Sequence, residues 1–189
     1  VTNGSHQSDL FPFSNESDFN SGKTFAGRIQ YTIPIGQGIE LAASGAIGPQ
    51  DRQPDDGVLQ WHYGFAAKVD VGDFRGSAEF VTGRALGKTD AGGAKCGAAP
   101  CLFYRGAYGQ LAWRANSYLQ PYVRVDWRTA RHQRGTDWAY VSTAVRGTFG
   151  LRADLTSYLT LKAEYVLNRS VDILEFPDDV FTTSLVVAY

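Results

Sequence analysis

The chain has 189 residues, 43% hydrophobic and 20% charged, with 18 basic and 19 acidic side chains and a net charge of −1. This balance leaves no global field to attract nucleic acid, and the apolar content is too high for a disordered chain. No apolar run of about 18 residues occurs, so a transmembrane helix is excluded. The beginning, VTNGSHQSDL, does not have the pattern of a signal peptide either.

Apolar and polar residues alternate with a period of two in nine segments, which predict an all-β chain of nine strands. In chain order the segments are 24–33, 37–48, 58–70, 73–84, 103–114, 118–129, 138–153, 157–169 and 180–189. In the clearest of them, Leu159 and Leu161 fall on one face and Lys162 and Glu164 on the other. Each segment is longer than the usual ~5–6 residues of a strand in a soluble protein and suits a tilted strand across a membrane.

The connections between these segments alternate in length. Short links lie at 34–36, 71–72, 116–117 and 155–156, and longer polar loops at 48–57, 85–102, 130–137 and 170–179. Short turns on one side and long loops on the other are typical of a transmembrane, antiparallel, up-and-down β-barrel of the bacterial outer membrane. We expect one such domain over 1–189, with 1–23 mainly a further extracellular loop and the strands in 24–189. An odd strand count and a chain without methionine indicate the later part of a larger barrel.

Two cysteines, Cys96 and Cys101, stand close together in KCGAAPC, inside a long loop. We expect a small disulfide, which requires an oxidising compartment; two unrelated thiols are the alternative. No His, Cys or Asp cluster has metal-ligand spacing, so no metal site is expected. The three histidines offer no convincing Ser–His pair, and ALGKTD lacks the glycines of a phosphate loop. We therefore expect neither an enzyme nor a cofactor.

The alternation gives each strand one apolar and one charged face. Aromatic residues near strand ends and small residues on the apolar face favour lipid on that side, with a lipocalin-like soluble barrel as the alternative. The opposite face is then predicted to line a pore. Its basic members are Arg28, Lys68, Arg75, Arg114, Arg124, Arg128, Arg146, Arg152 and Lys162, and its acidic members are Glu40, Asp70, Glu79, Asp126 and Glu164.

The basic excess of this face predicts a mild preference for anions. Selectivity is expected to rest on four inward cations on adjacent strands: Arg124, Arg128, Arg146 and Lys162. The alternative is a structural ladder in which these charges pair across strands. Arg105 is a misfit, because its parity places it on the lipid face near the extracellular end. It is expected to reach head groups or lipopolysaccharide phosphates, and a β-bulge that shifts the register is the alternative.

The last segment, DVFTTSLVVAY, places Phe181, Leu185, Val187 and the final Tyr189 on one face. It resembles the terminal strand of bacterial outer-membrane proteins, so 181–189 is expected to be read by the barrel-assembly machinery. More broadly, VTNGS, AGRIQYTIP and FGLRADLTSYLTLKAEYVLNR resemble bacterial porins, within them the phosphate-selective porin O and P group, over its C-terminal half. The resemblance implies a homotrimeric channel of about 16 strands.

The expected function is therefore that of a porin, allowing passive diffusion of small anionic or neutral hydrophilic solutes. Outer-membrane lipid and lipopolysaccharide are the expected surroundings, and nucleic acid is not an expected partner. The alternative is a non-conducting barrel that acts through its loops as an adhesin, assembly partner or structural anchor. A soluble β-barrel binder is the third possibility.

Overall fold

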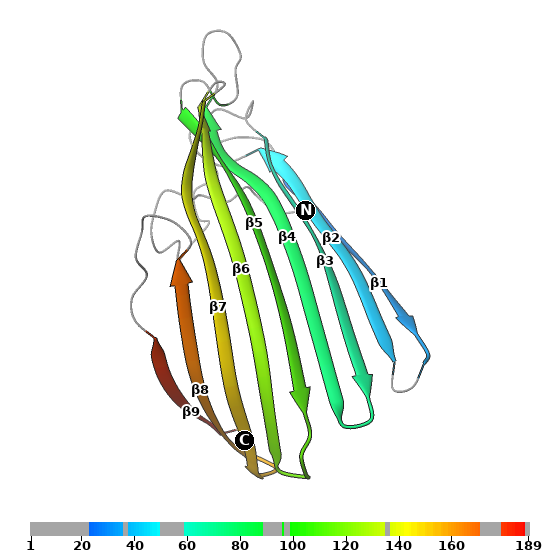
Figure 1. Ribbon diagram of the computed structural model, residues 1–189. Helices are drawn as coiled ribbons and strands as arrows, with labels where there is room; N and C mark the ends of the chain where they lie inside the picture. Colours follow the sequence, from blue (N-terminus) through cyan, green and yellow to red (C-terminus); the bar gives the residue numbers. More distant parts are fainter. Residues whose placement is uncertain are drawn as a thin grey trace.

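The computed structural model is all-β and describes residues 23–35, 38–49, 59–88, 96, 99–134, 137–170 and 179–187. It contains nine strands: β1 (Phe25–Ile33), β2 (Ile39–Pro49), β3 (Leu59–Val71), β4 (Phe74–Lys88), β5 (Ala99–Trp113), β6 (Leu119–Arg134), β7 (Asp137–Thr156), β8 (Leu159–Ser170) and β9 (Val180–Val187). They form one antiparallel sheet in the order of the chain (Figure 1). The predicted nine-strand, up-and-down arrangement is confirmed.

Within the part of the chain described here, no helix is long and apolar enough to cross a membrane.

Several strands extend beyond the predicted boundaries. β5 begins at Ala99 and β6 continues to Arg134, so the predicted loops at 85–102 and 130–137 are partly strand. β7 continues to Thr156, and the turn that follows lies at 157–158 rather than 155–156. The reason is that ladder hydrogen bonds join backbone groups, so pairing continues where the alternation of side chains has ended. Most of the predicted loops at 1–23, 48–57 and 170–179, and the final Tyr189, lie outside the described residues.

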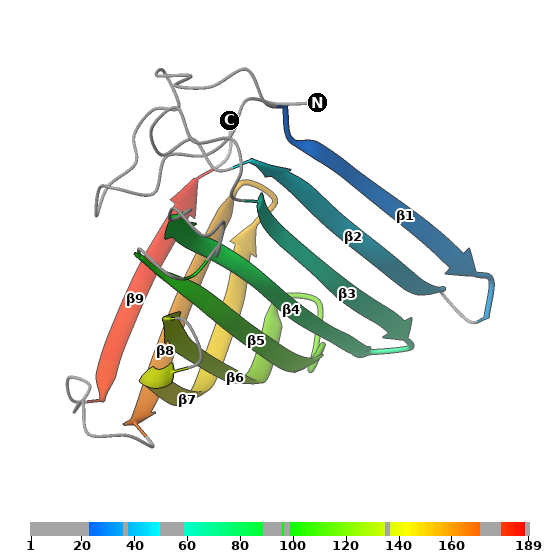
Figure 2. The same cartoon turned by 90° about the horizontal axis from the view of Figure 1, so that it is seen from above.

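The sheet is bent but not closed. Seen from above, β1 and β9 form its two edges (Figure 2). Among the described strands each pairs only with its neighbours in the chain, and β1 does not pair with β9. The observed fold is therefore an open nine-stranded sheet, and the closed barrel stays a prediction.

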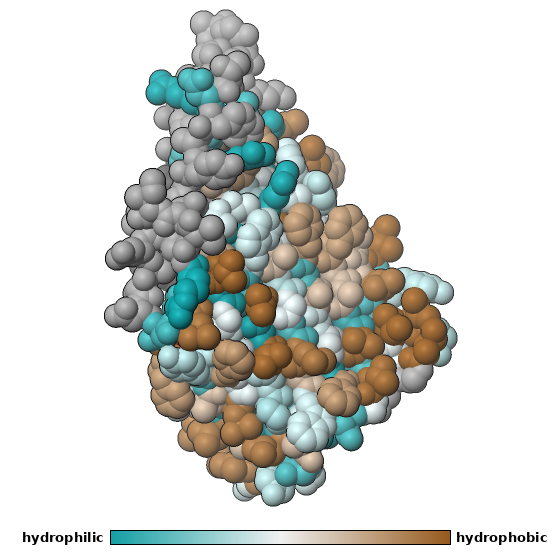
Figure 3. All heavy atoms as spheres, in the orientation of Figure 1, coloured by the Kyte–Doolittle hydropathy of each residue, from teal (hydrophilic) through white to brown (hydrophobic). Residues whose placement is uncertain are grey.

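The sheet is a single layer and has almost no conventional core. Among the described residues, the buried hydrophobic ones are Ala85, Cys101 and Ala112. Large side chains stay exposed instead, for example Ile29 at 78% and Phe181 at 67%. Figure 3 shows hydrophobic side chains gathered over the lower half of the molecule, toward the short turns. An apolar surface of this extent indicates contact with lipid or with another protein surface.

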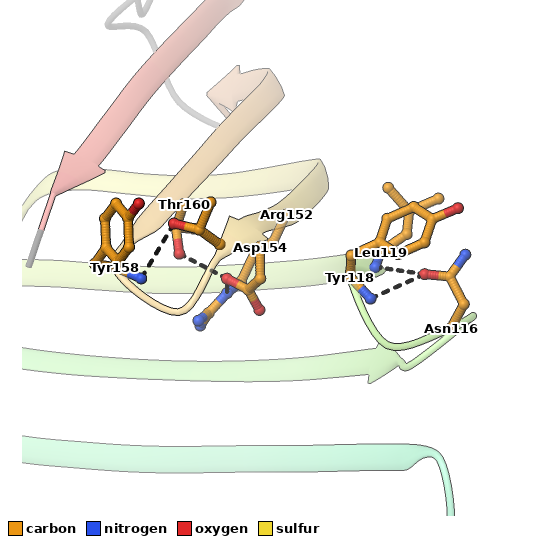
Figure 4. A network of polar contacts seen from close by, with 8 residues as sticks. Asn116, Tyr118, Leu119, Arg152, Asp154, Tyr158 and Thr160 are labelled. Carbon is orange, nitrogen blue, oxygen red and sulfur yellow. Dashed lines mark hydrogen bonds and ion pairs between the residues drawn. The ribbon is translucent and has the colours of Figure 1, made fainter.

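Tight turns join the strands at the end of the sheet opposite the long connections. Between β3 and β4, the paired residues Val71 and Phe74 are linked by two residues, and Gly72 has a φ of +56°. Glycine suits this position because the left-handed region is unfavourable for residues with a Cβ. Between β5 and β6, the Asn116 Oδ1 accepts hydrogen bonds from the backbone N–H groups of Tyr118, at 3.0 Å, and Leu119, at 2.8 Å (Figure 4).

A second polar cluster secures the turn between β7 and β8. The Asp154 Oδ1 accepts hydrogen bonds from the Arg152 Nε, at 2.9 Å, and from the Thr160 hydroxyl, at 2.6 Å (Figure 4). The Asp154 N–H in turn donates to the Tyr118 carbonyl at 2.7 Å, which ties the two turns together. This end of the sheet is therefore held by side-chain contacts as well as by the ladder.

Replacing Asn116 by alanine is expected to lower the free energy of unfolding by about 1 kcal/mol, because two turn N–H groups lose their acceptor. Urea unfolding in detergent micelles, followed by tryptophan fluorescence, measures the change. Ser117→Ala is the matched control, since the Ser117 hydroxyl makes no hydrogen bond within the described structure. Equal midpoints for the two variants would contradict a capping role for Asn116.

Candidate functional site: the polar face of the sheet

Residues that pair directly across two strands project from the same side of a sheet, so the register sorts strand residues onto two faces. One series of pairs runs through Glu79, Tyr108, Asp126, Arg146 and Asn168, from β4 to β8. We call the side that carries these residues the polar face. The other side, called the apolar face, carries the exposed hydrophobic residues of the strands.

The register places almost all of the predicted pore-lining residues on the polar face. They are Arg28, Lys68, Arg75, Glu79, Arg124, Asp126, Arg128, Arg146, Arg152, Lys162 and Glu164, with Glu40 and Asp70. Arg114 differs in position: it lies just beyond β5, where its N–H donates to the Asp73 carbonyl at 2.7 Å. That this face lines a pore stays a prediction, because the sheet is open.

Most cations of the polar face have a carboxylate partner. The pairs are Lys68 with Asp70 at 3.8 Å, Arg75 with Asp70 at 3.2 Å, Arg124 with Asp126 at 2.5 Å, Arg152 with Asp154 at 2.9 Å and Lys162 with Glu164 at 2.9 Å. The predicted basic excess is therefore largely compensated locally. Asp154 also has the parity of the polar face, but it lies one residue beyond the predicted end of its strand at 153.

Two tyrosines that the sequence did not single out, Tyr108 and Tyr122, each contact one cation of the polar face. The Arg124 guanidinium lies over the Tyr108 ring, 4.2 Å from its centroid. The Tyr122 hydroxyl donates to the Glu164 Oε1 at 2.5 Å, and the Lys162 ammonium lies 5.4 Å from the Tyr122 ring centroid. In the sequence, the only sign that Tyr108 and Tyr122 lie on the polar face is that both occupy even-numbered positions of their strands, as the charged residues do.

Two cations have an amide, not a carboxylate, as partner. The Arg146 Nε donates to the Asn168 Oδ1 at 3.0 Å, and Arg28 donates to the Gln30 amide oxygen at 3.5 Å. Within the described residues neither forms an ion pair. An amide leaves the positive charge uncompensated, so these two sites retain attraction for anions.

A partly open cavity of about 340 Å³ lies beside Arg146. Its lining includes Glu79, Tyr108, Asp126 and Arg128. Small residues between these side chains, such as Gly106, leave the space open. The cavity therefore offers both signs of charge and hydrogen-bonding groups to a small hydrophilic solute.

Aspartate 179 anchors the end of β8 at the rim of the sheet. Its Oδ1 accepts hydrogen bonds from Arg169, at 2.8 Å, and from the Asn168 N–H, at 3.1 Å. The Tyr165 hydroxyl donates to its Oδ2 at 3.4 Å. The Arg169 hydrogen bond, more than any other contact, holds the pKa of the Asp179 carboxyl below its usual value.

Asp179→Asn and Arg169→Gln are both expected to remove the same pH-dependent part of the stability. Because the folded pKa of Asp179 is lowered, its contribution is present above the unfolded value of about 3.9 and is lost as the pH falls through the folded pKa. The melting temperatures of both variants should therefore lie below the wild type at neutral pH and converge on it as the pH falls through the folded pKa of Asp179. Thermal unfolding across this pH range tests it, and a constant difference would contradict the coupling.

The predicted disulfide is confirmed. Cys96 and Cys101 are bonded, with their Cα atoms 5.1 Å apart, and Cys101 is fully buried at the start of β5. In the described ranges, no three His, Cys, Asp or Glu residues are grouped so that they could hold a metal ion.

A comparison with models of known protein families finds no match, and none of the curated proteins is significantly similar in sequence. The resemblance to porins therefore stays a prediction.

Proposed function

We propose that the chain forms the wall of a bacterial outer-membrane channel through which small hydrophilic solutes diffuse, with a mild preference for anions. The observation that carries this proposal is a single-layered sheet with two chemically opposite faces. One face bears charges along the middle of its strands, and the other exposes large hydrophobic side chains. Water on the first side and lipid on the second satisfy both faces at once.

The dimensions of the strands support this arrangement. β5 has 15 residues and β6 has 16, enough to cross a hydrocarbon core of about 30 Å with a tilt. At the short-turn end of the apolar face, Phe74 and Trp113 stack with their centroids 6.5 Å apart. Aromatic pairs at this level are typical of the interfacial girdle of an outer-membrane barrel.

Lipid provides no hydrogen-bond partners for a strand edge. In the proposed channel, β1 and β9 therefore pair with each other or with further strands. Closure in either way leaves the polar face inside and the apolar face outside, because the register fixes which side each residue occupies.

The anion preference rests on Arg28 and Arg146, whose charges have no carboxylate partner within the described structure. Fixed positive charge beside a water column lowers the barrier for anions. Local ion pairs compensate most of the remaining cations, so the preference is mild.

Planar-bilayer recording tests the channel directly. We expect stepwise conductance after insertion and, under a KCl gradient, a reversal potential of the sign for anion selectivity. The orientation of the faces is tested separately, by quenching with lipids brominated along their acyl chains. Trp113 and Trp127 belong to the apolar face and should be quenched.

Quenching without conductance would replace the channel by a non-conducting barrel that acts as an adhesin or anchor. Folding in buffer without detergent, with no quenching in the presence of vesicles, would favour a soluble binding protein. Either result contradicts the proposed function.

A further inference from the structure

The charged residues on the apolar face have an uneven distribution. The register assigns Arg84, Arg105, Arg131 and Arg169 to this face, all toward the long-connection ends of their strands. In the strands as described, the same face carries no aspartate or glutamate. Its short-turn end, around Phe74 and Trp113, has no arginine in the described strands. Positive charge on this face is therefore confined to one end.

The register also interleaves three of these arginines with aromatic residues. Neighbouring positions from β3 to β6 read Trp61, Arg84, Phe103 and Arg131. Two residues further along these strands, away from the long connections, Tyr63 and Arg105 lie on either side of Thr82. From the sequence, only Arg105 of these arginines is predicted to lie on the apolar face. Alternation within one strand does not show which residues of the neighbouring strands lie beside it.

A cavity of about 250 Å³ lies at this place and is lined by Trp61, Tyr63, Phe80, Thr82, Phe103, Arg105 and Arg131. Arg84 lies outside this lining, in register with Trp61 and Phe103. Trp61 and Tyr63 stack, with their ring centroids 5.6 Å apart. Arg105 is exposed, whereas Arg84 and Arg131 are partly buried. We call Trp61, Tyr63, Phe80, Arg84, Phe103, Arg105 and Arg131 the arginine–aromatic patch.

We propose that the arginine–aromatic patch binds the phosphorylated sugar headgroup of a glycolipid in the outer leaflet, with the acyl chains lying along the apolar face below. This proposal rests on the proposed function, which places the apolar face in lipid and the long connections outside. Guanidinium groups bind phosphate oxygens in pairs of parallel hydrogen bonds. Aromatic rings at the membrane interface have one apolar surface for acyl chains and sugar rings to contact.

Arg84 provides a fixed charge within the patch. Its Nη2 donates to the Leu59 carbonyl at 2.7 Å, which holds the guanidinium close to the sheet. Arg105 is exposed on the next strand, so an anionic group above the sheet can reach its guanidinium. The charges of Arg84 and Arg105 then act on the same headgroup.

The width of the patch favours a headgroup with more than one phosphate. Arg84 and Arg131 stand two strand spacings apart, about 10 Å, with Arg105 between them on β5. A sugar scaffold that carries two phosphates can give each outer arginine its own phosphate and also covers the aromatic residues between them. A single phosphodiester can satisfy these arginines only by drawing them together, and it leaves the aromatic residues uncovered.

The test uses the full chain, folded in detergent, and native mass spectrometry with three probes. They are lipid A with two phosphates, the same lipid A after removal of both phosphates, and phosphatidylglycerol. The wild type should retain intact lipid A in preference to the other two. Arg105→Gln combined with Arg131→Gln should weaken this retention about tenfold or more, because charged hydrogen bonds are lost.

Arg28→Gln is the matched control, since the same substitution on the polar face should leave lipid A retention unchanged. Arg105→Lys combined with Arg131→Lys should restore part of the retention, which separates loss of charge from loss of folding. Equal retention of phosphatidylglycerol or of dephosphorylated lipid A, or full retention by the glutamine variant, would overturn the proposal.

Conductance is recorded for the same preparations in phosphatidylglycerol bilayers, so the two proposals fail separately. A conducting protein without selective lipid A retention overturns only the lipid site. A lipid-binding protein without conductance overturns only the channel.

Discussion

Replacing Arg146 by glutamate is expected to shift the ion preference of the channel from anions toward cations. The wild-type guanidinium bonds to the Asn168 amide and keeps its positive charge uncompensated. After the substitution, the new carboxylate would stand in register with Asp126 and beside the 340 Å³ cavity that Glu79 also lines. The charges around this cavity would then be predominantly negative.

The ratio of anion to cation permeability should fall roughly threefold or more, since a change of two charges alters the local potential by an amount on the order of kT or above. Reversal potentials under a KCl gradient measure it. Arg146→Gln should give a smaller shift in the same direction. Arg105→Gln removes the same charge from the apolar face, away from this cavity, and should leave the preference unchanged. An unchanged reversal potential for the glutamate variant would contradict the role of Arg146.

The second large effect is expected at Gly150, where alanine should lower the free energy of unfolding by about 1–3 kcal/mol. Gly150 pairs with Tyr122 across β6 and β7, and the tyrosine ring lies where a Cβ of residue 150 would be. The new methyl group would displace the ring and break the Tyr122 hydrogen bond to Glu164. Urea unfolding in micelles measures the loss.

Gly109 is the matched control, because a Cβ at this strand glycine meets nothing within 4 Å. Gly109→Ala should be neutral or stabilising by about 0.5–1 kcal/mol, the usual difference between alanine and glycine inside a strand. In a Tyr122→Ala background, Gly150→Ala should lose most of its effect, because the clashing ring is gone. Equal effects of Gly150→Ala in both backgrounds would contradict the proposed contact.

The ion pairs of the polar face answer a question that the sequence left open. Pairing of the charges across strands was the alternative to a selective basic face, and among the described polar-face ion pairs the one between Arg75 and Asp70 joins two strands. The other four follow a single strand with a spacing of two residues, as in Arg124 with Asp126. Residues i and i+2 lie on the same face about 6.7 Å apart, and a long side chain leaning along the strand reaches that far.

The patch on the apolar face had a weaker sequence signal. Arg105 interrupts the alternation of its own strand, and Arg84 is the last residue of the predicted segment 73–84. Arg131 lies beyond the predicted end at 129, and it acquires a definite face because the backbone ladder of β6 continues to Arg134. The register between strands then brings Arg84 and Arg131 to either side of Phe103.

The sequence by itself determined that the chain is all-β, how many strands the sheet has, and which side chains share a face within each strand. These properties are local, because alternation follows from the geometry of one extended backbone. The tertiary structure alone decided the register between strands, and with it the partners of Arg124, Arg146 and Lys162 and the ring of Tyr122 over Gly150. It also decided that the described sheet is open at β1 and β9. Such contacts join residues that are far apart in the chain. Sliding one strand by two residues past its neighbour leaves every side chain on the same face, so the alternation within a strand cannot select the register.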